Sequence, residues 1–236
     1  MSIPAARRFY KEVTSERQGQ GYTVRLDGKA VKTPAKRTLV LPSATLSKAV
    51  AEEWRAQDED IRPETMPLTR LACTAVDRVS PGRDEVVEHV SAYGATDLLC
   101  YRAEGPPDLA EMQSDQWQPL LDWAAEELSA PLVAGAGVVH LTQSQDALAA
   151  LRRRVDTFSD FELTAVADLT QIMGSLILAL AVVYRRLSWR QAFDCSRIDE
   201  HWQNRQWGED AEAAARTEIL SRDVEAAARF AELAGN

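Results

Sequence analysis

The stretch EEWRAQDEDIRPETMPLTRLACTAVD, residues 52–77, lies where strand-like sequence gives way to helical sequence. Before it, apolar residues recur every four positions up to Trp54, which predicts a helix that begins near Ser43 and buries one stripe. Pro63 and Pro67 cannot continue that helix, because proline lacks an amide hydrogen and fixes its own backbone angle. We therefore expect a turned segment and then a second helix. Dense charge around a tryptophan, without a catalytic pattern, indicates a docking surface.

Residues 9–41, upstream of this stretch, are strand-like. Apolar residues alternate over 22–26, Asp27-Gly28 supplies a two-residue turn, and 30–33 returns along the first strand. This pattern predicts an antiparallel hairpin.

Nearly all of the sequence after residue 42 has helical spacing. The predicted helices cover 109–128, 145–158, 161–186 with a break near Gly174, 188–206 and 211–234. Residues 132–141 contain two glycines and fit a short strand or an extended connection better. We expect an α+β fold, in which a small antiparallel β-rich portion, residues 1–60, precedes a larger, mostly α-helical domain, residues 61–236.

Composition excludes several classes of protein. With 236 residues and 45% hydrophobic content, the chain can bury a substantial core. Its net charge of -9 argues against a nucleic-acid binder, which needs a basic face. The longest apolar run, 172–184, is shorter than the roughly 20 residues that cross a bilayer, so we expect no membrane insertion. The N-terminus resembles neither a signal peptide nor a transit sequence, which predicts a cytoplasmic bacterial protein.

The sequence contains no recognisable motif for catalysis, metal binding or phosphate binding. The three cysteines, Cys73, Cys100 and Cys195, are odd in number and form no CxxC pair, which favours a reducing compartment. The histidines form no HExxH pattern, and the glycines form no phosphate-binding loop. We therefore predict neither a metal nor another cofactor, and no enzymatic activity. Acidic pairs such as Glu209-Asp210 leave a hydrolase with scattered carboxylates as an alternative.

Six tryptophans occur beside charges in helical regions. Trp202 and Trp207 lie in EHWQNRQWGED, where Gly208 should end the helix, so both rings are expected near a helix end. Aromatic rings beside glutamate, glutamine and arginine resemble the composition of binding hot spots.

Eight segments, in order, resemble one protein family. They are RRFYKEV (7–13), YTVRLDGKAVKTPAK (22–36), LVLPSATLSKAVAEEWRAQ (39–57), IRPETMPLTRLACTAVD (61–77), TDLLCYRAE (96–104), WQPLLDWA (117–124), GSLILALAV (174–182) and EHWQNRQWGEDAEA (200–213). The most specific positions are Trp54, Gln57, Pro63, Met66, Pro67, Glu200, Gln203, Trp207 and Gly208. The chain is similar to the F-type ATP synthase assembly chaperones of mitochondria and α-proteobacteria, which bind the α subunit of the catalytic head. Lys29 departs from the family, where arginine is more usual, and the absence of a mitochondrial presequence indicates a bacterial member.

The resemblance implies a chaperone without catalysis or cofactor, free as a monomer, which holds the new α subunit until the β subunits join. Eukaryotic relatives would work in the mitochondrial matrix. The residues expected to bind the partner are Trp54, Glu200, Trp202, Gln203 and Trp207. Trp54 could instead serve to fix its helix against the core. A scaffold subunit that stays in a finished complex is a further alternative.

Overall fold

The computed structural model describes residues 6–208 and 210–235. Residues 1–5 and Glu209 lie outside this range. The expectation about a signal peptide rests partly on the first five residues, and Glu209 belongs to the acidic pair named above. By their internal contacts the described residues form two units. The first unit contains those within 1–83, 159–165 and 229–236, and the second those within 84–158 and 166–228. The sequence predicts a boundary at residue 60 because the kind of secondary structure changes there. That these two portions, 1–60 and 61–236, are domains stays a prediction.

A three-stranded antiparallel sheet, ordered β2-β3-β4, lies in the first unit. It consists of β2 (Val13–Gln18), β3 (Gly21–Leu26) and β4 (Lys29–Ala30). Asp27 and Gly28 both have positive φ angles, 48° and 78°, as a tight two-residue hairpin turn requires. The predicted hairpin, formed by β3 and β4, is confirmed. Strand β2 pairs with β3 along the whole length of β3.

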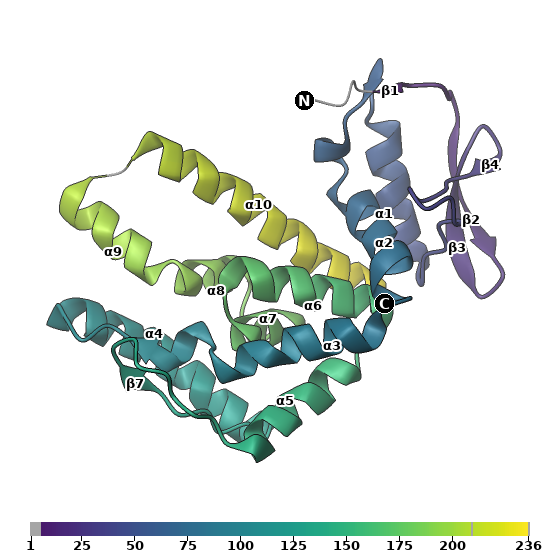
Figure 1. Ribbon diagram of the computed structural model, residues 1–236. Helices are drawn as coiled ribbons and strands as arrows, with labels where there is room; N and C mark the ends of the chain where they lie inside the picture. The colour runs from purple at the N-terminus through teal and green to yellow at the C-terminus, as the bar shows by residue number, and fades with distance from the viewer. Residues whose placement is uncertain (1–5, 209, 236) are drawn as a thin grey trace. The chain divides into compact units, whose positions relative to one another are not determined.

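Helix α1 (Ala44–Arg55) packs against this sheet (Figure 1). The Ser43 side chain accepts a hydrogen bond from the Leu46 amide at 3.0 Å, so the predicted N-cap is present. Leu46 and Val50 are fully buried and form the predicted stripe. After α1 the chain forms β5 (Asp60–Ile61), which pairs with β1 (Ala6–Arg7).

The segment after β5 turns as the prolines predict. It forms the short turn η1 (Pro63–Thr65), then α2 (Pro67–Thr74) and the π-helical η2 (Ala75–Val79). Pro67 stands at the first helical position, where a missing amide hydrogen costs nothing.

The second unit is built mainly from helices. Figure 1 labels α3 (Arg83–Ala92), α4 (Pro107–Glu127), α5 (Gln145–Asp156), α6 (Asp160–Met173), α7 (Leu176–Val183), α8 (Trp189–Ser196), α9 (Ile198–Trp207) and α10 (Ala211–Ala234). Parts of α3, α6 and α10 belong to the first unit. The turns η3 (Tyr93–Ala95) and η4 (Leu98–Cys100) lie between α3 and α4. A short parallel pair, β6 (Tyr101–Arg102) and β7 (Gly135–Ala136), agrees with the short strand predicted within 132–141.

Of two helix breaks in the structure, the sequence predicts one and not the other. The predicted break at Gly174 is confirmed, since its φ of +68° separates α6 from α7. The helix predicted over 188–206 is wrong in one respect, because Arg197, with φ -116°, divides it into α8 and α9. Arginine carries no helix-breaking signal, so packing decides this second break.

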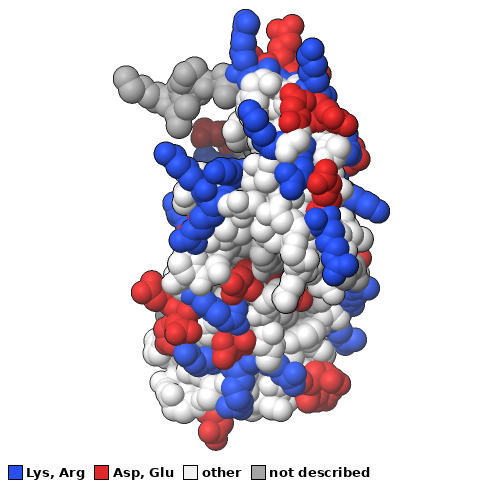
Figure 2. Space-filling view, turned by 90° about the vertical axis from the view of Figure 1, so that its right-hand side faces the viewer, with Lys and Arg blue, Asp and Glu red and all other residues white. Residues whose placement is uncertain are grey.

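The predicted α+β class is confirmed by these elements. Among the described helices, none combines the length and apolar character needed to cross a membrane. Figure 2 shows lysine and arginine side chains interspersed with acidic ones on the face that it draws, without one continuous basic field.

Candidate partner-binding site

Helix α9 places Glu200 and Gln203 on the wall of a hollow of about 480 Å³ in the second unit. Gln171 and Gly174, at the end of α6, and Leu98 of η4 line other parts of it. Trp117 of α4 and Ser196 of α8 also line it, so residues from five elements meet at this hollow.

The Glu200 carboxylate is held but remains open to solvent. Its Oε1 accepts a hydrogen bond from Arg197 Nη1 at 2.8 Å, while the side chain keeps 48% of its exposure. Arg197 also donates from Nη2 to the Ile172 carbonyl oxygen at 2.8 Å, which fixes the guanidinium against α6. The carboxylate is thus held in position in the lining of the hollow and is still accessible to solvent.

Helix α4 is hydrogen-bonded to both α8 and α9. The buried Trp117 donates from Nε1 to the Cys195 carbonyl oxygen at 2.9 Å. Gln113, also buried, donates to the Asp199 carboxylate at 2.5 Å. These bonds flank the break at Arg197 and hold the Glu200 wall in place.

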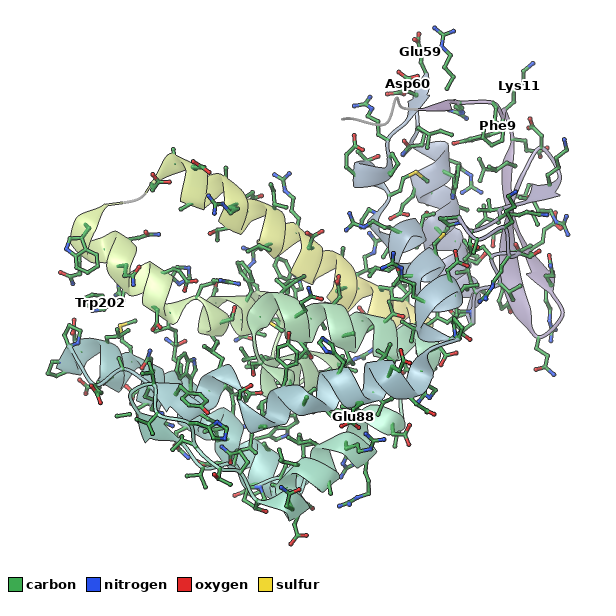
Figure 3. The ribbon with its side chains drawn as sticks, viewed as in Figure 1. Phe9, Lys11, Glu59, Asp60, Glu88 and Trp202 are labelled. Carbon is green, nitrogen blue, oxygen red and sulfur yellow. The ribbon has the colours of Figure 1, made fainter. Side chains whose placement is uncertain are left out.

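Trp202 and Trp207 form an edge-to-face pair with ring centroids 5.6 Å apart. Trp202 is only 9% exposed and donates from Nε1 to the Asp108 carboxylate at 2.8 Å, between α9 and the start of α4 (Figure 3). Trp207 is 75% exposed, and Gly208, with φ +88°, ends the helix directly after it. Trp202 is therefore a support for the exposed ring of Trp207.

Trp54 belongs to the first unit, so the five predicted residues do not form one cluster within either unit. Its ring is partly buried, 5.7 Å from that of Tyr10, and the Tyr10 hydroxyl donates to the Trp54 carbonyl oxygen at 2.7 Å. Among the described residues, nothing accepts a hydrogen bond from its buried indole nitrogen.

Sequence reasoning missed the other residues around the Glu200 hollow. Arg197, Gln171 and Leu98 come from different elements and share no motif or spacing. Only the tertiary structure brings them to Glu200.

The described residues include no group of three or more histidine, cysteine, aspartate or glutamate side chains that could hold a metal ion. Burial raises the pKa of the Cys73 and Cys195 thiols to about 11 and that of Cys100 to about 12. All three thiols therefore stay protonated near neutral pH and are poor nucleophiles.

Helix α9 thus presents the exposed ring of Trp207 and the exposed carboxylate of Glu200, and exposed tryptophans are enriched at protein-binding surfaces. A family model described as "ATP12 chaperone protein" matches residues 7–125. The crystal structure of Atp12 from Paracoccus denitrificans is 43% identical, with a TM-score of 0.94, and the match covers 97% of this chain and 98% of that one. A protein of Agrobacterium tumefaciens is 38% identical, with a TM-score of 0.94 over 98% of this chain and 87% of that one.

The mitochondrial atp12 protein of Schizosaccharomyces pombe is 26% identical over 246 residues, which cover 94% of this chain and 84% of that protein. The chain belongs to the ATP12 family of assembly chaperones. The family resemblance inferred from the sequence is thereby confirmed.

Proposed function

We propose that this chaperone binds the unassembled α subunit of the F-type ATP synthase catalytic head and prevents its aggregation until β subunits join. Membership of the ATP12 family supports a role in assembly. We further propose that it works as a monomer in the bacterial cytoplasm and catalyses no reaction.

The physical problem is the exposed interface of the client. A subunit of an obligate ring presents a large apolar surface before assembly, and such surfaces aggregate. A chaperone must cover that surface and later release it. A few aromatic anchors can supply most of the affinity, while charged residues at the rim set orientation at little cost to release.

The observation that carries this proposal is that Glu200 and the exposed Trp207 lie on one short helix, α9. Trp207 supplies an apolar anchor, and Glu200 supplies a fixed charge at the hollow. Both groups are presented by a helix that α4 holds rigidly, so little entropy is lost when a partner binds.

Glu200→Lys tests the proposal. Because Glu200 is exposed and its ion pair with Arg197 lies at the surface, we expect the unfolding free energy to fall by no more than about 1 kcal/mol. The reversed charge should reduce recovery of co-expressed α subunit in the complex by about tenfold or more, measured by size exclusion. Glu126→Lys, on the exposed side of α4, is the matched control and should leave recovery unchanged.

Recovery of the α subunit with folded Glu200→Lys at the wild-type level would remove Glu200 from the binding surface. If the wild-type chain forms no complex with the α subunit, the proposed client is wrong. Presence of the chain in mature synthase would instead identify a scaffold subunit.

A further inference from the structure

The first unit contains a separate apolar hollow of about 380 Å³. Its walls come from the end of α1, β5 and the turn after it, helices α2 and η2, and the segment that carries Pro34. The apolar part of the lining consists of Pro34, Trp54, Ile61, Pro63, Met66 and Cys73. A volume of this size accommodates one large side chain of a partner.

The walls of the hollow are fixed before any partner arrives. The Glu53 carboxylate accepts hydrogen bonds from the amides of Leu68 and Thr69, at 2.7 and 2.8 Å, at the beginning of α2. The buried Gln57 side chain accepts from the Arg62 amide at 2.7 Å and donates to Thr65 Oγ1 at 3.0 Å. The turn that carries Ile61, Pro63 and Met66 is therefore preorganised, which lowers the entropy cost of binding.

The charged residues in the lining are two arginines and one aspartate. Arg70 and Arg78 are exposed and line the hollow. The one acid in the lining, Asp77, is partly buried and accepts from Thr33 Oγ1 at 2.7 Å and from the Ala35 amide at 2.9 Å. A partner with a carboxylate beside its apolar side chain matches this rim, although the whole chain carries a net charge of -9.

We propose that this hollow is a second docking site, which takes a large apolar side chain flanked by acidic residues from the client protein. The identity of that client rests on the proposed function, whereas the chemistry of the hollow does not.

Short labelled peptides test the chemistry of the site on the full chain by fluorescence anisotropy. One peptide has a central leucine pair flanked by glutamates, a second has the same pair flanked by lysines, and a third has serines between glutamates. We expect the first to bind at least about tenfold more tightly than either of the others at physiological salt.

Two variants locate the binding. Cys73→Phe places a ring in the hollow, and Arg78→Glu reverses a charge at its rim; each should weaken binding of the first peptide by about tenfold or more. Lys48→Glu makes the same change of charge on the exposed face of α1, away from the hollow, and should leave binding within about twofold. Circular dichroism shows whether each variant is folded. If Cys73→Phe does not fold, the binding of the first peptide to Arg78→Glu decides whether the site exists.

Equal binding of all three peptides, no binding of the first, or full binding by Arg78→Glu would overturn the second site. These outcomes do not depend on the α subunit. Capture of the α subunit by wild type and by both variants alike would also refute this site while leaving the proposed function intact.

Discussion

The carboxyl group of Asp97 lies wholly inside the second unit and links two segments there. Its Oδ1 accepts from Ser175 Oγ at 2.7 Å and from the Leu99 amide at 3.1 Å, and its Oδ2 accepts from the Ile177 amide at 3.0 Å. Leu98 and Gly174, which adjoin these residues, line the Glu200 hollow. The buried Asp97 side chain thus holds together two segments that line the candidate site.

Asp97 gives the protein a predictable dependence on pH. Burial raises its pKa to about 6, from the ordinary value of 3.8, although its hydrogen bonds oppose that rise. Because the folded protein binds this proton more tightly, the stabilising effect is complete below pH 3.8 and is lost as pH rises through 6. Relative to Asp97→Asn, the wild type should lose about 3 kcal/mol of unfolding free energy across that window, measured by urea titration. A constant difference between the two proteins would show that Asp97 does not titrate there.

At the scale of elements, two interruptions shape the candidate site. Gly174 separates α6 from α7, and Arg197 separates α8 from α9. Both residues line the Glu200 hollow. A continuous helix at either place would carry the following residues in another direction, so the site depends on where helices end as much as on which side chains they carry.

Gly174→Ala tests the first interruption. A Cβ at this position would meet no atom within 4 Å, so the cost arises from the positive φ of +68° alone. We expect a loss of about 1–2 kcal/mol in unfolding free energy, measured by denaturant titration. Gly105→Ala is the matched control, because its added Cβ also meets nothing within 4 Å and its φ is not positive. Equal effects of the two substitutions would contradict the backbone explanation.

At the scale of the whole molecule, the first unit is assembled from three distant parts of the chain. Phe230, fully buried near the C-terminus, stacks on Phe161 with centroids 6.0 Å apart. The Ser43 hydroxyl donates to the Leu233 carbonyl oxygen at 2.5 Å. The last turns of α10 therefore complete the unit that begins with the hairpin.

Phe230→Ala should consequently destabilise the unit that contains the N-terminal sheet. Removing a fully buried aromatic ring costs about 3–5 kcal/mol, which chemical unfolding followed by circular dichroism will measure. Ile219→Ala, on the same helix but 58% exposed, should change stability by no more than about 0.5 kcal/mol. Wild-type stability in Phe230→Ala would show that the C-terminal turns are dispensable.

The sequence by itself determined the features that depend on near neighbours along the chain. These include the Asp27-Gly28 hairpin, the cap at Ser43, the break at Gly174 and the α+β class, together with the family. Turn, cap and periodicity signals act within a few residues, so they can be recognised without a structure.

Only the tertiary structure decided which side chains meet. It divided α8 from α9 at Arg197, buried Trp202 beneath the exposed Trp207 and enclosed the carboxyl group of Asp97. It also formed the apolar hollow beside Trp54, in the stretch first taken for a docking surface. Burial and hollows arise from packing between residues far apart in the chain, which no local pattern encodes.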